Sequence, residues 1–173
     1  SFVGTDDERV ILINSFSKTY AMTGWRIGYI LSANNEAMHQ MIKLQYYITA
    51  CSNDAMQYAV LEAMNVADDY PDQMCVEYKA RRDLICSRLN AMKGIQCHVP
   101  EGAFYVFPKV DVPNMKSQDV ALELLKGGVL CSPGSAFGPS GEGHLRFAYT
   151  ISQEDISRGM DKVEATLKRL SNQ

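Results

Sequence analysis

Two short apolar runs, VILI at residues 10–13 and IGYIL at residues 27–31, most constrain what this chain can fold into. A continuous apolar run of this length is typical of a β-strand that is buried on both faces of a sheet. Such strands need helices packed against the sheet, so the two runs predict an α/β fold. The residues between the runs are expected to form a loop that begins where the first strand ends.

The next part of the chain has the composition and spacing of helices. Residues 34–47 and 53–65 are rich in Met, Ala, Leu and Gln, and each segment is expected to form a helix. A longer helical pattern begins at Pro71, a residue suited to the first turn of a helix, and continues to Met92. At a rise of about 1.5 Å per residue this helix would span roughly 33 Å. A helix of that length can connect two domains.

The C-terminal part of the chain mixes short strand patterns with two further helices. Ser117 is expected to cap a helix at residues 118–126, which the Gly-Gly pair after it would end. Ser152 and Asp155 resemble a capping box at the start of the last helix, whose apolar residues keep helical spacing. The expected strands are residues 103–107, 129–131 and 145–149.

The overall composition argues against several classes of protein. With 17 basic and 20 acidic side chains the net charge is −3, which gives no electrostatic case for a nucleic-acid partner. The five cysteines contain no Cys-x-x-Cys pair, which indicates a reduced, cytoplasmic protein. The three histidines lie far apart, so no metal site is expected. The first residues are polar and the apolar runs are short, so neither a signal peptide nor a membrane span is expected.

The loop between the first two strands carries the most informative motif, SFSKTYAMTGWRIGY at residues 15–29. A lysine amine such as that of Lys18 does covalent chemistry by condensing with a carbonyl group. If that carbonyl belongs to pyridoxal phosphate, the hydroxyls of Ser15 and Ser17 and the guanidinium of Arg26 suit its phosphate. A short Ser-x-Ser-Lys sequence alone is usually a solvated lysine in a turn, so the assignment depends on the whole stretch.

The whole stretch closely resembles the pyridoxal-phosphate lysine signature of the class I and II aminotransferases, which are fold-type I enzymes. Its TYAMTGWR form is most similar to the bacterial aspartate aminotransferase branch. Three later segments also resemble family motifs. They are PEGAFYVFP at residues 100–108, SPGSAFG at 132–138, and HLRFAY at 144–149.

The resemblance implies a fold and a domain plan for the chain. The fold is a fragment of the fold-type I pyridoxal-phosphate-dependent transferase fold, with α/β architecture. Residues 1–66 would be the C-terminal end of the large cofactor domain and residues 67–93 the connecting helix. Residues 94–173 would be the small α+β domain.

The resemblance also implies a role for individual residues. Lys18 would hold pyridoxal 5′-phosphate as a Schiff base and, once released, carry the α-proton. Arg26 would bind the cofactor phosphate together with Ser15, and less directly with Ser17. Arg146 would grip the α-carboxylate of an amino acid or 2-oxo acid. No metal ligand is implied.

Other parts of the family's cofactor site lie upstream of the lysine, above all the aspartate that pairs with the pyridinium nitrogen. Only seventeen residues precede Lys18 here. The chain is therefore expected to be the C-terminal part of a cytoplasmic, homodimeric aminotransferase. It is also expected to be inactive alone, because the ring without its acidic partner is a poor electron sink. Its first two strands would lack neighbours, and open strand edges favour association.

Two other functions remain open from the sequence. A β-lyase of the same fold would use the same lysine and both arginines, and would release a 2-oxo acid without transferring nitrogen. An aminotransferase-like sensor domain of a transcription regulator would bind the cofactor without catalysis. A third reading is that the fragment is an inert folding unit.

Overall fold

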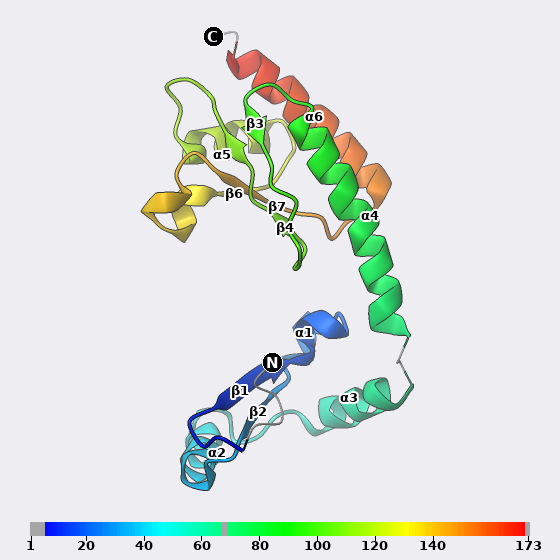
Figure 1. Cartoon of the computed structure of the whole chain (residues 1–173), viewed down its shortest axis with the longest axis vertical. Helices are drawn as coiled ribbons and strands as arrows, with labels where there is room; N and C mark the ends of the chain where they lie inside the picture. Colours follow the sequence, from blue (N-terminus) through cyan, green and yellow to red (C-terminus); the bar gives the residue numbers. More distant parts are fainter. Residues whose placement is uncertain (1–5, 67–68, 172–173) are drawn as a thin grey trace. The chain divides into compact units, whose positions relative to one another are not determined.

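The computed structural model describes residues 6–66 and 69–171 of the chain. These residues form two compact units, one that ends at Gln73 and one that begins at Met74 (Figure 1). The boundary falls inside helix α4 (Tyr70–Asn90). Within the described residues, no helix is both long enough and apolar enough to cross a membrane.

The first unit combines one antiparallel pair of strands with two longer helices. Ser15 at the end of the first strand lies opposite Gly28 at the start of the second. Asn34 caps the first long helix, since its Oδ1 accepts a hydrogen bond from the Ala37 N–H at 2.9 Å. The elements in chain order are β1 (Ile11–Ser15), α1 (Phe16–Thr19), η1 (Thr23–Trp25), β2 (Gly28–Ser32), α2 (Asn35–Thr49) and α3 (Asp54–Val66).

The first unit buries few apolar side chains. Ile27 and Val60 are its buried apolar residues within the described range, whereas Ile13 is 72% exposed and Leu31 is 53% exposed. The predicted strands and helices form, but the expectation that both faces of the strands are buried is wrong for this chain. Among the described residues, β1 and β2 pair only with each other, so two strands and two helices leave much of the sheet uncovered.

In the second unit, helices α4 and α6 lie side by side against small sheets (Figure 1). Arg88 of α4 donates to Asp161 of α6 at 2.5 Å. In the three-stranded sheet, β7 lies between β4 and β6 and is antiparallel to both. The elements after α4 are β3 (Ile95–Gln96), β4 (Tyr105–Val106), β5 (Lys109–Val110), α5 (Ser117–Lys126), β6 (Ser132–Pro133), η2 (Gly134–Phe137), η3 (Pro139–Gly141), β7 (Leu145–Ala148) and α6 (Gln153–Ser171).

The second unit has a hydrophobic core of its own. The predicted apolar face of α6 is confirmed, because its residues Ile156, Met160, Val163, Leu167 and Leu170 are all buried. They pack in one cluster with side chains from α4, α5 and the strands. Burying a Leu, Ile or Val side chain contributes about 1.5–3 kcal/mol. The second unit is therefore stabilised by a buried apolar core, which the described part of the first unit lacks.

The predicted helix cap at Ser152 is confirmed, whereas one predicted strand and the predicted cap at Ser117 are wrong. Ser152 caps α6 as expected, because its Oγ accepts from the Asp155 N–H at 3.1 Å. The predicted strand at residues 129–131 is absent, since the Val129 N–H instead donates to Leu124 O at the end of α5. The strand in this region is β6, which begins at Ser132.

The predicted capping role of Ser117 is also wrong. The N-cap position of α5 is occupied by Lys116, whose side chain makes no capping hydrogen bond. The Ser117 N–H donates instead to Glu142 Oε1 at 2.6 Å, and the Ser117 Oγ donates to Ser135 Oγ at 3.2 Å. A carboxylate from a distant loop thus supplies the acceptor at this helix end.

Candidate functional site

Lys18 lies on a single helical turn directly after β1. Ser15 ends the strand in an extended conformation, and α1 begins at the next residue. The Phe16 N–H donates to Ile27 O at 3.3 Å, so the pairing of β1 with β2 continues one residue beyond the strands. The Phe16 ring also contacts the Tyr29 ring, with centroids 5.4 Å apart. These contacts fix the turn that carries the exposed Lys18 at the end of the strand pair.

Arg26 lies at the other end of the same connection, immediately before β2. Its backbone is left-handed, with φ 55° and ψ 48°, a conformation that costs a non-glycine residue about 1–2 kcal/mol. Its Nη1 donates to Thr23 O at 2.9 Å. Within the described part of the chain, no carboxylate forms an ion pair with Arg26.

Gly28 explains how closely the two strands approach at this point. A Cβ at this position would lie 2.6 Å from Asn14 O, so a larger residue would push β2 away from β1. The glycine therefore keeps the start of β2 against the end of β1. The structure thus places Ser15, Ser17, Lys18 and Arg26 in or beside one short connection, as the motif predicts.

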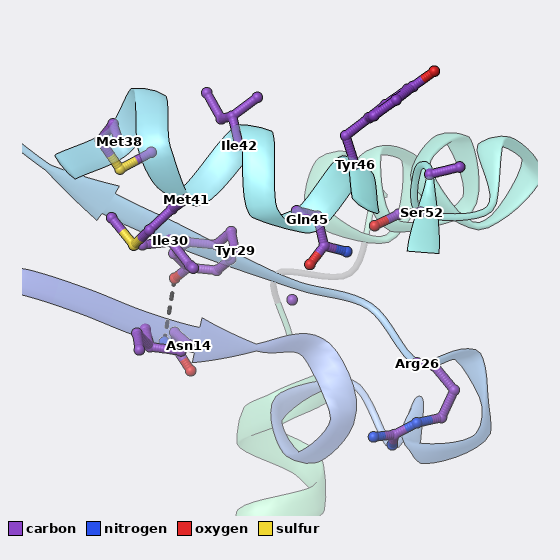
Figure 2. Close-up of a pocket in the computed structure, with 13 residues that line it drawn as sticks. Asn14, Arg26, Tyr29, Ile30, Met38, Met41, Ile42, Gln45, Tyr46 and Ser52 are labelled. Atoms are coloured by element: carbon purple, nitrogen blue, oxygen red, sulfur yellow. Dashed lines mark hydrogen bonds between the residues drawn. The ribbon is translucent and has the colours of Figure 1, made fainter. Parts of the chain in front are cut away.

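A hollow of about 570 Å³ lies between this strand pair and α2 (Figure 2). Met41 reaches from α2 toward Tyr29 and Ile30, and Asn14 Nδ2 donates to Tyr29 Oη at 3.2 Å across the strands. Arg26 is at its edge, but Lys18 does not line it. The hollow is mainly apolar, and we read it as uncovered sheet surface rather than as a cofactor cavity.

Arg146 belongs to the second unit and lies in the middle strand of its three-stranded sheet. Its neighbours Leu145 and Phe147 point into the core, with 1% and 4% exposure, so Arg146 lies on the opposite face. Its Cζ lies 4.5 Å from the ring centroids of both Tyr105 and Phe137. Among the residues that the structure describes, Arg146 makes no ion pair with an acidic side chain. An unneutralised guanidinium suits a carboxylate, which it can bind with two parallel hydrogen bonds.

The sequence indicates Arg146 but not the residues that surround it. Tyr105 and Phe137 contact the guanidinium, and Ser132 Oγ accepts a hydrogen bond from its Nη2 at 3.4 Å. All three lie in the GAFY and SPGSAFG motifs. The sequence showed these motifs but not that their side chains contact Arg146. Among the described residues, no cluster of His, Cys, Asp or Glu could hold a metal ion.

The chain matches a protein-family model described as aminotransferase class I and II over residues 1–163. It is 38% identical over 164 residues to an aspartate aminotransferase of Pyrococcus abyssi, covering 93% of this chain and 42% of the relative. It is also 38% identical to aromatic-amino-acid aminotransferase 2 of Thermococcus litoralis, with the same coverage.

Solved structures give the same picture. The aromatic aminotransferase from Pyrococcus horikoshii matches with a TM-score of 0.86 and 38% identity, over 94% of this chain and 44% of that one. The aspartate aminotransferase from Rhizobium meliloti matches with a TM-score of 0.85 and 34% identity, over 95% and 43%. This likeness confirms the predicted fold class. The chain spans about two-fifths of the length of the relatives it matches.

Proposed function

Because this chain belongs to the family of class I and II aminotransferases, as its match over residues 1–163 shows, we propose that it is the C-terminal part of a complete aminotransferase. The complete protein would move an amino group from an amino acid to a 2-oxo acid. The observation that carries the proposal is the β1–β2 connection, where Lys18 and Arg26 lie at the two ends of one short loop. The relatives' names differ in amino acid, so we propose the reaction class only.

The residues of this connection fit pyridoxal phosphate, on which the family generally depends. Lys18 offers an amine that can bond to an aldehyde carbon. Arg26, with no acidic partner among the described residues, offers a positive charge to a phosphate, and Ser15 and Ser17 add hydroxyl donors. When bound, the cofactor supplies an electron sink for the bonds at the substrate's α-carbon.

Each side chain then has a separate task. Lys18 would hold the cofactor through its Nζ, and the same Nζ would accept the proton from the substrate Cα. Arg26 holds the cofactor by its phosphate group. Arg146 orients the substrate by its α-carboxylate, through the two parallel hydrogen bonds that a guanidinium can make.

An assay of nitrogen transfer tests the proposal. The complete protein, loaded with pyridoxal phosphate and given an amino acid and a 2-oxo acid, should form one new amino acid for each 2-oxo acid released. Lys18→Ala should abolish this transfer, whereas Lys43→Ala on the exposed surface of α2 should not. Release of the 2-oxo acid without a new amino acid would contradict an aminotransferase and favour a β-lyase.

The family resemblance also supports a homodimer in the cytoplasm as the working form of the complete protein. Light scattering of the purified complete protein would test this assembly, and a mass of one chain would contradict it. Fractionation of cells would test the location.

A further inference from the structure

We propose that Tyr105 and Phe137 are positioning residues, whose rings hold the Arg146 guanidinium ready for a carboxylate. This inference rests on the proposed function, because it takes Arg146 as the group that binds the substrate's α-carboxylate. It adds two residues that act through Arg146 and do not themselves bind the substrate.

The contacts come from both strands that flank Arg146. Arg146 lies in β7, the middle strand of the order β4-β7-β6. Tyr105 lies in β4 on one side, and Phe137 ends η2, which follows β6 on the other side. Both ring centroids are 4.5 Å from the Arg146 Cζ. Ser132, directly opposite Arg146 in the register of β6 with β7, accepts from Nη2 at 3.4 Å.

The two ring contacts use none of the N–H groups of Arg146, and Ser132 accepts from Nη2 alone, so the other N–H groups stay available to a ligand. A cation over a ring is attracted to the negative face of the π system, without using an N–H group. A carboxylate, in contrast, is bound by the N–H groups at the edge of the guanidinium plane. Two ring contacts therefore restrain the long side chain while its charge remains unneutralised by any described acidic residue. A side chain ordered in advance loses less entropy when the ligand binds.

The loop that carries Phe137 is itself fixed. Gly134 and Gly141 pack backbone to backbone, and a Cβ on either one would collide with the carbonyl oxygen of the other. The Gly134 N–H donates to His144 O at 2.8 Å. The Phe137 ring also meets the Phe107 ring edge to face, with centroids 5.9 Å apart. Phe137 is thus held by its loop, although its side chain is half exposed.

Ring-removing and ring-keeping variants of the complete, cofactor-loaded enzyme test the inference. Tyr105→Leu and Phe137→Leu remove one ring each, while Tyr105→Phe and Phe137→Tyr keep it. Tyr58→Leu is the control for loss of a ring, because Tyr58 is an exposed tyrosine of α3 that, among the described residues, makes no ring contact with Arg146 or Phe137. The measured quantities are kcat and KM for an amino acid, the inhibition constant of propionate, and the rate with an amine that has no carboxylate.

Each ring-removing variant should raise KM and the propionate constant by about two- to thirtyfold, the range expected for loss of one cation–π contact. The value of kcat and the rate with the plain amine should stay within about twofold, because a restraint on Arg146 acts on carboxylate binding alone. The ring-keeping variants and Tyr58→Leu should behave as the unchanged enzyme. Equal losses for carboxylates and plain amines would overturn the inference, since they would indicate a role in the fold.

A spectroscopic readout needs neither activity nor cofactor. In the nitrogen-15 NMR spectrum of the 173-residue chain, the Arg146 Nε–Hε signal is identified by its loss in Arg146→Lys. Ring currents from Tyr105 and Phe137 should shift it away from the position of a solvated arginine, and each ring-removing variant should move it back. An unshifted signal in the unchanged chain would overturn the inference even if a Leu variant failed to fold.

The Arg146→Lys variant separates failure of this inference from failure of the proposed function. If Arg146→Lys leaves the propionate constant unchanged, Arg146 does not bind the carboxylate and its role in the proposed function fails. If Arg146→Lys weakens propionate at least tenfold but the ring-removing variants do not, the ring inference alone fails.

Discussion

Arg26 occupies a backbone conformation that suits glycine better than arginine, and it donates only to the nearby Thr23 carbonyl among the described residues. We expect Arg26→Ala in the complete protein to raise the dissociation constant of pyridoxal phosphate about ten- to a hundredfold. A charge-assisted hydrogen bond contributes about 1.5–3 kcal/mol, which corresponds to that range. Equilibrium dialysis measures the constant. Arg9→Ala is the control, because Arg9 is an exposed arginine paired with Asp7, and an unchanged constant for Arg26→Ala would exclude Arg26 as the phosphate ligand.

The cysteines should differ sharply in reactivity. Burial raises the pKa of the Cys97 thiol to about 12 and that of Cys131 to about 11. Since the thiolate is the reactive form, the thiolate fraction of each at pH 8 is at most about one in a thousand. We expect maleimide to label the exposed Cys51 and Cys75 quickly and the other cysteines only after unfolding. Mass spectrometry of the labelled peptides checks this, and fast labelling of Cys97 in the folded chain would contradict the burial.

At the scale of elements, local signals in the sequence predicted where helices form. They did not predict the contacts that a helix makes with residues far away in the sequence. The end of α5 at the Gly-Gly pair and the cap of α6 at Ser152 each depend on residues that are close in sequence, and both predictions are confirmed. The start of α5 depends instead on Glu142, which is 25 residues away from Ser117 in sequence. A one-dimensional pattern cannot show that contact. For the same reason the sequence indicated Arg146 and the two aromatic motifs, but not that the rings contact the arginine.

The contact of Glu142 with α5 makes a prediction about pH. Hydrogen bonds from the Ser117 and Gly143 N–H groups lower the pKa of the Glu142 carboxyl. A lowered pKa in the folded state means that the ionised carboxylate stabilises the fold. This stabilisation is complete above the ordinary pKa of a glutamate and is lost as the pH falls through the lowered value.

We therefore expect Glu142→Gln to speed amide hydrogen exchange in α5 relative to the unchanged protein at pH 7. The difference should shrink as both proteins are compared at increasingly acidic pH. Glu101→Gln, a change at an exposed glutamate, is the control and should leave exchange in α5 unchanged. A difference that is the same at every pH would show that the charge of Glu142 is not involved.

At the scale of the whole molecule, the two units differ in how much of their apolar surface is covered. The sequence predicted the strands of the first unit from their apolar runs, yet Ile13 and Leu31 are exposed here. An apolar run indicates that other elements pack on both faces of a strand. It does not show which elements these are, because they come from other parts of the sequence. The chain spans about two-fifths of its relatives' length, and we propose that the rest of the complete protein covers these strands.

A pair of alanine substitutions tests this proposal. In the 173-residue chain, Leu89→Ala should lower the free energy of unfolding by about 2–5 kcal/mol, because Leu89 is fully buried. Ile13→Ala should have almost no effect there, because most of its side chain is exposed. In the complete protein, Ile13→Ala should cost about as much as Leu89→Ala does. If Ile13→Ala leaves the free energy of unfolding of the complete protein unchanged, the proposal that the rest of the protein covers these strands is contradicted.

The central claim is that Lys18 binds the cofactor, and borohydride reduction with peptide mapping tests it most directly. Reduction of the loaded complete protein should fix the pyridoxyl group on Lys18 and prevent trypsin from cleaving after that residue. Residues 10–26 should then appear as one modified peptide, because trypsin cleaves after Arg9 and Arg26 on either side. Normal cleavage after Lys18, with the pyridoxyl group on another lysine, would contradict the claim.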